Sequence, residues 1–268
     1  MKVSGKTWVV TGAASGIGRE LVLQLLRRGG RVAAVDVRED ELSATAELAG
    51  PAGALSTHVV DITDPERVGA VVDEVIEAHG AVDGLINNAG IIQPFAPLAD
   101  LDQADIDRVL AVNLMGTVYM LKAFLPHLLR RPEAHVANVS SLGGYFPFPG
   151  QSVYGASKAA VKLLTEGLYG ELLDTHVSVS VIMPGPTQTN IAAHSEASVA
   201  QPTQSRLRIT TAADAARMAI EGIEKGRLHI YLGGLARATS VAIRIAPRRS
   251  IRFVRNQMAK LAVTGERE

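Results

Sequence analysis

The chain has 268 residues, of which 47% are hydrophobic, and its formal net charge at pH 7 is zero. This length accommodates one sizeable α/β domain without requiring two. The balanced charge creates no overall field that would recruit nucleic acid. The sequence contains no cysteine, which excludes disulfides, thiolate metal sites and cysteine nucleophiles and suits a cytoplasmic protein. No apolar run approaches the roughly 20 residues of a membrane span, and the N-terminus enters a strand-like segment at once, so we expect neither a transmembrane helix nor a signal peptide.

Strand-like and helical segments alternate along the chain, which predicts a parallel sheet covered by helices on both faces. The predicted strands are Thr7–Val10, Arg31–Asp36, Leu55–Val60, a strand ending in Leu85–Asn88, His135–Val139, Val177–Met183 and Leu228–Leu232. The predicted helices are Gly16–Arg28, Asp40–Leu48, Pro65–His79, Gln103–Leu129, Val153–Leu173 and Ala212–Glu224. Asn190–Thr210 shows no clear period, and we expect a mobile lid there. The expected fold is α/β, a single-domain Rossmann fold with a doubly wound seven-stranded parallel sheet, formed by residues 1–235.

Residues 236–268 form a C-terminal extension with a different charge from the rest of the chain. They contain eight Lys or Arg and two Glu, a net charge of +6, so residues 1–235 carry −6. Beyond Pro247, the segment Arg248–Leu261 has the spacing of a basic amphipathic helix. Such a helix can make a peripheral contact with an anionic membrane. It can equally pack on its own body or on a partner subunit with its arginines in water.

A glycine-rich turn, Thr11-Gly12-Ala13-Ala14-Ser15-Gly16-Ile17-Gly18, follows the first predicted strand and opens the first predicted helix. Glycines permit a tight turn and a close approach of the backbone to a pyrophosphate, which then lies at the helix N-terminus. The spacing G-x-x-x-G-x-G differs from the commoner G-x-G-x-x-G, and a glycine-rich turn alone is more often ordinary turn chemistry. The strand–turn–helix context favours a dinucleotide site.

Two acids follow the next predicted strands. Asp36 lies 18 residues after Gly18, where a carboxylate accepts hydrogen bonds from the adenosine ribose hydroxyls; a loop-starting Asp is the alternative. A carboxylate there repels a 2′-phosphate, so NAD(H) is predicted in preference to NADP(H), although Arg38 can soften this preference. Asp61 is placed to meet the adenine edge, or instead to cap the helix that begins at Pro65.

Tyr154 and Lys158 lie one helical turn apart on one face of a predicted helix. The cation favours phenolate, so we expect it to lower the pKa of Tyr154 from about 10. Alone, such a pair is usually a solvated helix face. Together with a dinucleotide-binding turn, it indicates redox chemistry on an alcohol or a carbonyl group.

With these motifs, the chain resembles a classical short-chain dehydrogenase/reductase over about residues 5–235. The matching motifs are the glycine-rich turn, Asn87-Asn88-Ala89-Gly90, Asn113, Ser140-Ser141, Tyr154-x-x-x-Lys158, and Pro184-Gly185 followed by Thr189. The resemblance implies an NAD(P)-dependent oxidoreductase that interconverts a secondary alcohol and a ketone by hydride transfer, and a homo-oligomer, either dimer or tetramer. Many members of the family end soon after the seventh strand, so the extension puts the usual tetramer in doubt.

The resemblance also implies roles for individual residues. Tyr154 is the expected general acid/base, Lys158 binds the nicotinamide ribose, Ser141 polarises the carbonyl, and Asn113 holds a water that links Lys158 to solvent. Ser140 is the second choice for the serine. The cofactor-binding set predicted from the motifs and the resemblance is Gly12, Ser15, Gly16, Ile17, Gly18, Asp36, Asp61, Ile62, Asn88, Ala89, Gly90, Tyr154, Lys158, Pro184, Gly185, Thr187 and Thr189.

Aromatic residues gather between the proposed serine and tyrosine. Tyr145, Phe146 and Phe148, with Phe95, predict an apolar wall for a hydrophobic alcohol or ketone; aromatic anchoring of the loop is an equal alternative. The histidines show no metal-ligand spacing, so we expect no metal. Two other functions stay open: an NADPH-linked carbonyl reductase, and a non-catalytic dinucleotide-binding sensor on the same fold.

Overall fold

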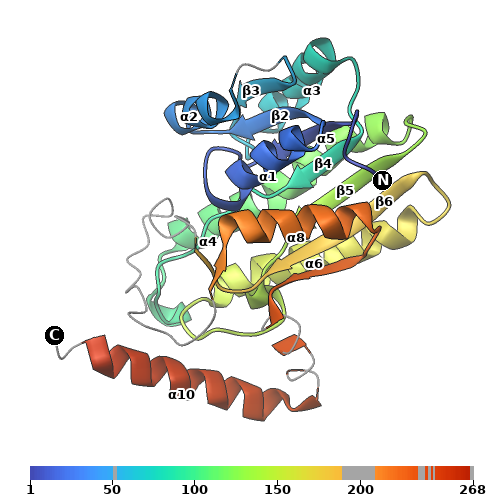
Figure 1. Cartoon of the computed structure of the whole chain (residues 1–268). Helices are drawn as coiled ribbons and strands as arrows, with labels where there is room; N and C mark the ends of the chain where they lie inside the picture. The colour runs from blue at the N-terminus through green and yellow to red at the C-terminus, as the bar shows by residue number, and fades with distance from the viewer. Residues whose placement is uncertain (51–52, 189–208, 235–238, 241–242, 244, 266–268) are drawn as a thin grey trace.

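The computed structural model describes residues 1–50, 53–188, 209–234, 239–240, 243 and 245–265, with side chains in the last helix as far as Asn256. Seven parallel strands form one sheet in the order β3-β2-β1-β4-β5-β6-β9 (Figure 1). They are β1 (Thr7–Thr11), β2 (Arg31–Asp36), β3 (Leu55–Val59), β4 (Gly84–Asn87), β5 (Ala134–Val139), β6 (Val177–Pro184) and β9 (His229–Leu232). The strand order reverses direction at β1, which pairs with β2 on one side and β4 on the other. The doubly wound sheet is therefore confirmed, and its crevice lies outside the carboxyl ends of β1 and β4.

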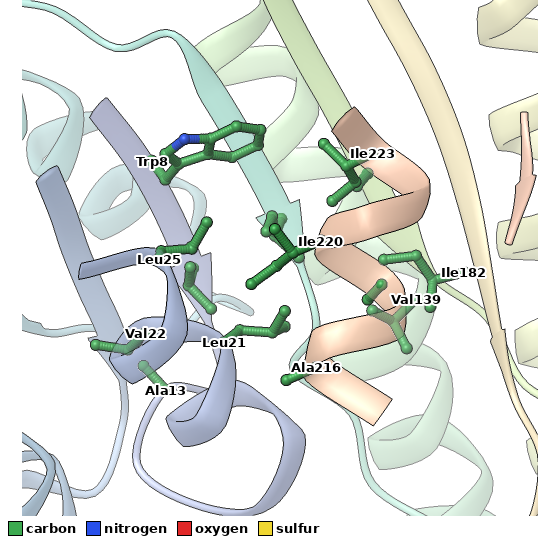
Figure 2. Packing of buried hydrophobic residues seen from close by; sticks show 14 of the residues in the cluster. Trp8, Ala13, Leu21, Val22, Leu25, Val139, Ile182, Ala216, Ile220 and Ile223 are labelled. Atoms are coloured by element: carbon green, nitrogen blue, oxygen red, sulfur yellow. The ribbon is translucent and has the colours of Figure 1, made fainter. Parts of the chain in front are cut away.

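Helices cover both faces of the sheet. One layer contains α1 (Gly16–Arg27), α2 (Glu39–Ala49) and α8 (Ala212–Glu224), and the other contains α3 (Pro65–His79), α5 (Thr117–Leu128) and α6 (Ser152–Glu171). Side chains of β1 alternate between the two layers, since Trp8 and Val10 join the core under α1 and α8 while Val9 joins the other core. Figure 2 shows Trp8 and Ile220 packed in the first of these cores. The strands are buried on both sides, which explains their continuous apolar runs.

The predicted helix Gln103–Leu129 is divided into three parts. It comprises α4 (Gln103–Leu110), a π-helical segment η2 (Ala111–Gly116) and α5. Residues 103–128 are long and apolar enough to cross a membrane by length and composition, which the sequence expectation did not anticipate. Met120, Phe124 and Leu128 are buried against the sheet, so this helix is a core element of the α/β body.

Several features lie beyond the seven-stranded sheet and its helix layers, and among them α10 (Pro247–Gly265) was predicted from the sequence as a helix over Arg248–Leu261. Two short strands, β7 (Thr187–Gln188) and β8 (Thr210–Thr211), pair in parallel as a separate small sheet. The expected lid, residues 190–210, lies almost wholly outside the part of the chain that the structure describes. The remaining elements are the short helices η1 (Leu98–Asp100) and η3 (Leu142–Gly144), and α10 (Pro247–Gly265), which lies outside both helix layers (Figure 1).

Candidate active site

A cavity of about 380 Å³ opens at the carboxyl ends of the central strands. Its volume falls in the range of cofactor and ligand sites. Most of the predicted site residues line it: Gly12, Ser15, Gly16, Ile17, Asp36, Asp61, Ile62, Asn88, Ala89, Gly90, Ser141, Tyr154, Lys158, Pro184, Gly185 and Thr187. Gly18, Asn113 and the four predicted aromatic residues do not line it, and Thr189 lies outside the described residues.

The glycine-rich turn forms the middle of the cavity floor. Gly12 and Gly16 have positive φ angles of 69° and 54°, which favour glycine. A Cβ on Gly12 would lie 2.8 Å from the Asn88 amide nitrogen, and one on Gly18 would collide with the Gly12 carbonyl oxygen. Gly18 therefore serves the packing of α1 against the turn. Ser15 is the N-cap of α1 but makes no side-chain capping bond, so the first-turn N–H groups can serve a bound anion. This cradle fits a dinucleotide diphosphate.

Asn88 joins the end of β4 to the glycine-rich turn. Its side-chain amide donates to the carbonyl oxygens of Thr11 at 3.0 Å and Gly12 at 3.3 Å. In the other direction, the backbone N–H groups of Asn88 and Ala89 donate to the Thr11 hydroxyl at 3.0 and 3.1 Å. These bonds fix the two strand ends at the topological switch point of the sheet.

Asp36 and Arg38 occupy the end of the cavity expected to receive adenosine. Asp36 accepts hydrogen bonds from the Ala14 N–H at 2.9 Å and from the Arg38 Nε at 3.2 Å. Arg38 extends in turn to Glu41, at 2.9 and 3.0 Å, and to the Ser15 hydroxyl at 3.2 Å. Because the Asp36 carboxylate lines the cavity, it can still face a ribose hydroxyl.

Asp61 is exposed and accepts from the backbone N–H and the hydroxyl of Thr63 at 2.9 and 2.8 Å. It does not cap α3. That position belongs to Asp64, whose carboxylate accepts from the N–H groups of Glu66 and Arg67. Asp61 was expected either to meet the adenine edge or to cap α3, and the structure rules out the cap. Asp61 lines the cavity next to buried Ile62.

The opposite end of the cavity brings Ser141, Tyr154 and Lys158 together. Ser141 is the N-cap of η3, and its hydroxyl accepts from the Gly143 N–H at 3.0 Å and shares a hydrogen bond with the Tyr154 phenol. Lys158 is 3% exposed, and its ammonium donates to the Val139 carbonyl oxygen at 3.0 Å. Ser141 and Tyr154 are therefore in direct contact, and Lys158 lines the same cavity.

The pKa of Tyr154 is raised, contrary to the prediction from the sequence. Burial of the phenol raises it, and the Ser141 hydrogen bond offsets part of that effect. Burial also lowers the pKa of Lys158 to about 8. The prediction was wrong because it used only the spacing of the two residues, whereas the cost of burying each charge depends on the folded surroundings.

Ser140 also lines the cavity, whereas Asn113 does not. The Ser140 hydroxyl donates to the Lys158 carbonyl oxygen at 2.7 Å, and so secures α6. Asn113 is fully buried in the π-helical segment, where its side chain bonds both backbone groups of Ile91 at 2.8 and 2.9 Å and donates to the Ser157 hydroxyl at 3.0 Å. The π turn aims this amide away from the helix, as such turns often do beside functional sites.

Gln93 was missed by the sequence analysis. It is fully buried, and its side-chain oxygen accepts from the backbone N–H groups of Val153 and Tyr154, both at 2.9 Å. Its amide nitrogen donates to the Gly150 carbonyl oxygen at 3.1 Å. Gln93 thus caps the first turn of α6 and holds Tyr154. The sequence analysis missed Gln93 because its role depends on contacts with α6 that form only in the folded chain. In the sequence it resembles any other loop glutamine.

None of the four predicted aromatic residues lines the cavity. Phe95 is 45% exposed, Phe146 is buried, and the rings of Phe146 and Phe148 are 5.8 Å apart. Tyr145 packs edge-on against Tyr231 at 6.2 Å and shares a side-chain hydrogen bond with Thr239, while burial raises its pKa to about 12. Through Thr239, the beginning of the C-terminal extension contacts the loop that carries these aromatic residues.

The final part of the cavity wall follows β6. Pro184, Gly185 and Thr187 line it, and the Thr187 hydroxyl donates to the Gly185 carbonyl oxygen at 2.9 Å. In the described part of the chain, no cluster of three or more His, Asp or Glu side chains is arranged to hold a metal ion.

A doubly wound parallel sheet with a nucleotide-sized cavity at its switch point, and with Ser, Tyr and Lys at one end, defines a dinucleotide-dependent oxidoreductase. A family model for the short chain dehydrogenases matches residues 6–200. The chain therefore belongs to the short-chain dehydrogenase/reductase family.

Among curated proteins, one of Mycobacterium tuberculosis that bears the name "Putative oxidoreductase SadH" is 35% identical over 269 residues, which cover 96% of each chain. Because the alignment covers 96% of this chain, it must include part of the C-terminal extension, residues 236–268. A 3beta-hydroxysteroid dehydrogenase of Eggerthella lenta is 36% identical over 191 residues, covering 70% of this chain and 74% of that protein.

Solved structures agree. A short chain dehydrogenase/reductase from Burkholderia phymatum in complex with NAD has a TM-score of 0.82 and 31% identity, covering 90% of this chain and 93% of its own. One from Burkholderia cenocepacia in complex with NADP has a TM-score of 0.80 and 26% identity, covering 95% and 99%. Similar proteins therefore bind either nicotinamide dinucleotide, and the choice in this chain depends on its own residues.

Proposed function

We propose that the protein interconverts a hydrophobic secondary alcohol and its ketone, with NAD(H) preferred over NADP(H). The observation that carries this proposal is the single cavity with Asp36 at one end, the open N-terminus of α1 in the middle, and Tyr154 with Ser141 at the other end. Bound NAD⁺ would supply the hydride acceptor for alcohol oxidation, and NADH the donor for ketone reduction. The chain supplies position, proton transfer and electrostatics.

In the oxidation direction, the alcohol C–H bond breaks and its electron pair leaves with the hydrogen as hydride, which bound NAD⁺ would accept. The alcohol O–H proton passes to the Tyr154 oxygen, which must first have released its own proton to solvent. Ser141 donates a hydrogen bond to the same substrate oxygen as charge develops there. Lys158 binds the nicotinamide ribose, and the hydrogen bond with Ser141 offsets part of the rise in the Tyr154 pKa. Reduction reverses each transfer, with Tyr154 giving its proton to the new alcohol oxygen.

The substrate class rests on Phe95 and on the aromatic residues of the loop between Ser141 and Tyr154. Phe95 is half-exposed near Gly150, at the edge of the loop that carries Phe146 and Phe148. Aromatic side chains in the loop between Ser141 and Tyr154 suit an apolar alcohol or ketone rather than a small anion. The hydroxysteroid dehydrogenase among the relatives supports a bulky apolar substrate by analogy alone.

The test is a screen of hydrophobic alcohols and ketones with NAD(H) and NADP(H), following the absorbance of the reduced nicotinamide. Turnover that is faster with NAD(H) supports the proposal. Turnover with NADP(H) alone favours the alternative carbonyl reductase, for which the NADP-bound neighbour is the support. Tight binding of a nucleotide without turnover of any substrate, in both wild type and Tyr154→Phe, favours a non-catalytic sensor.

We also propose a cytoplasmic homo-oligomer whose α10 makes a peripheral contact with anionic membranes. Arg248, Arg249, Arg252 and Arg255 are exposed on this helix, as is Phe253, which is 62% exposed. No acid occurs between Pro247 and Gly265. Basic side chains with an apolar neighbour suit a lipid surface. Docking of the helix on a second subunit is the alternative, and the salt dependence of the contact separates the two.

A further inference from the structure

Glu41 holds the guanidinium group of Arg38 at the adenosine end of the cavity. Both Glu41 carboxylate oxygens accept from the Arg38 Nη1, at 3.0 and 2.9 Å. The other edge of the guanidinium is bonded to Asp36, through Nε at 3.2 Å and Nη2 at 3.4 Å. One cation therefore lies between two carboxylates at the point where a 2′-phosphate would enter.

Arg38 is the side chain at this end that could accept NADP(H). A guanidinium matches phosphate geometry, and it stays charged at every working pH. Arg38 lines the cavity and is 30% exposed, so it is close enough to the ligand space to act. Asp36 opposes a 2′-phosphate by repulsion, but it leaves the Nη1 group of Arg38 available. In this structure, that group is occupied by Glu41.

We infer that Glu41 is a specificity-determining residue that prevents Arg38 from binding a 2′-phosphate. It does so in two ways: its carboxylate uses the Nη1 hydrogen bonds, and its negative charge cancels the attraction of the guanidinium. The inference rests on the proposed NAD(H) preference and assigns part of that preference to a residue on α2, outside the cavity lining.

The position of Glu41 allows a matched control. Glu39, Asp40 and Glu41 all lie in the first turn of α2, where acids favour the helix N-terminus. Glu39 is exposed, and it is the same residue type two positions away. Glu39→Gln thus removes the same charge from the same helix end and leaves the Arg38–Glu41 contact in place.

The experiment measures dissociation constants of NADH and NADPH by fluorescence titration for wild type, Glu41→Gln, Glu39→Gln and the double variant Arg38→Gln/Glu41→Gln. We expect Glu41→Gln to tighten NADPH binding about tenfold, the scale of one hydrogen bond to a charged group, with NADH changed by less than about threefold. Glu39→Gln should leave the ratio of the two constants unchanged. The double variant should lose the gain, since the gain needs the guanidinium.

Unchanged NADH binding by Glu41→Gln shows that this variant is folded. If both nucleotides bind and the ratio in Glu41→Gln stays within about twofold of wild type, the inference is wrong while the proposed function stands. A gain that persists in the double variant also overturns it, because Arg38 would then play no part. If wild type binds neither nucleotide, the proposed function and the inference fail together.

Discussion

The adenosine end and the catalytic end of the cavity hold their cations in different surroundings. Arg38 lies between the carboxylates of Asp36 and Glu41 and is 30% exposed. Lys158 is buried and donates to the Val139 carbonyl oxygen, an uncharged partner, and burial lowers its pKa to about 8. At the adenosine end, the carboxylates of Asp36 and Glu41 neutralise the charge of Arg38. This end therefore selects between cofactors by repelling the 2′-phosphate of NADP(H). At the catalytic end, the buried ammonium of Lys158 has no carboxylate partner among the described residues and lowers the stability of the fold. Such a cost is expected where a residue is kept for catalysis rather than for stability.

The largest expected effect is on the catalytic end. Tyr154→Phe removes the transferable proton and keeps the ring, so turnover should fall about 10²-fold or more. NADH binding should change little, because the phenol is needed for proton transfer. Steady-state rates and NADH titration check this. Near-normal turnover of the true substrate by this variant would remove Tyr154 from the mechanism.

Lys158→Met tests the cost of the buried cation. The pKa of about 8 in the folded protein is below the value of about 10.4 for a free lysine, so the unfolded chain binds more protons between these values. The cost is therefore fully present below pH 8 and disappears as pH rises to about 10.4. At pH 7 the variant should be more stable by about 1–3 kcal/mol and nearly inactive.

Denaturant unfolding of wild type and Lys158→Met at pH 7 and pH 10 checks the sign. The stability gain should shrink at the higher pH. A variant that is less stable than wild type at pH 7 would contradict the account of a strained cation at the catalytic end.

Gln93 gives a smaller effect at the same end. Gln93→Ala leaves the N–H groups of Val153 and Tyr154 without their acceptor, so it should loosen the first turn of α6 and lower kcat about tenfold. The KM for NADH should stay within about twofold. Gln93→Glu keeps an acceptor oxygen and should recover part of kcat. A loss of melting temperature with kcat unchanged would make Gln93 a stabilising residue only.

The smallest effect on nucleotide binding is expected from the C-terminal extension. Removal of residues 247–268 keeps Thr239 and its contact with Tyr145, so the NADH dissociation constant should stay within about twofold. Co-sedimentation with anionic vesicles should be lost, since each lipid-near Arg contributes about 1 kcal/mol, and the full chain's binding should weaken as salt rises. Binding of the truncated chain equal to that of the full chain would remove α10 as the membrane contact, and a salt-insensitive change in oligomer size would favour the subunit contact.

The parts of the site that are local in sequence could be predicted. The glycine-rich turn, Asp36 and the one-turn spacing of Tyr154 and Lys158 each depend on a few neighbouring residues. Part of the turn, Asp36, Tyr154 and Lys158 line the cavity. The strand and helix types could be predicted for the same reason, because hydrophobic periodicity is local. The predicted ends of the strands and helices differed from those in the structure by a few residues.

The rest depends on residues that meet only in the folded chain. Gln93 contacts Val153 of α6, which lies 60 residues further along the chain. The π-helical segment at Asn113 does not change the spacing of apolar residues in the sequence, so the sequence pattern did not reveal it. The direction of the Tyr154 pKa was wrong because burial was unknown. The N-cap of α3 is Asp64, a residue that the sequence analysis did not consider when it gave capping as the alternative role of Asp61.

The central claim is that the adenosine end selects the cofactor and the catalytic end performs the chemistry. The direct test measures NADH and NADPH dissociation constants and single-turnover hydride transfer for Asp36→Ala, Tyr154→Phe and the double variant. We predict that Asp36→Ala narrows the NADH preference by the same factor with or without Tyr154, and that Tyr154→Phe lowers the rate by the same factor with either cofactor, within about twofold. A cofactor preference that changes with Tyr154→Phe, or wild-type binding of NADPH equal to or tighter than NADH, would contradict the claim.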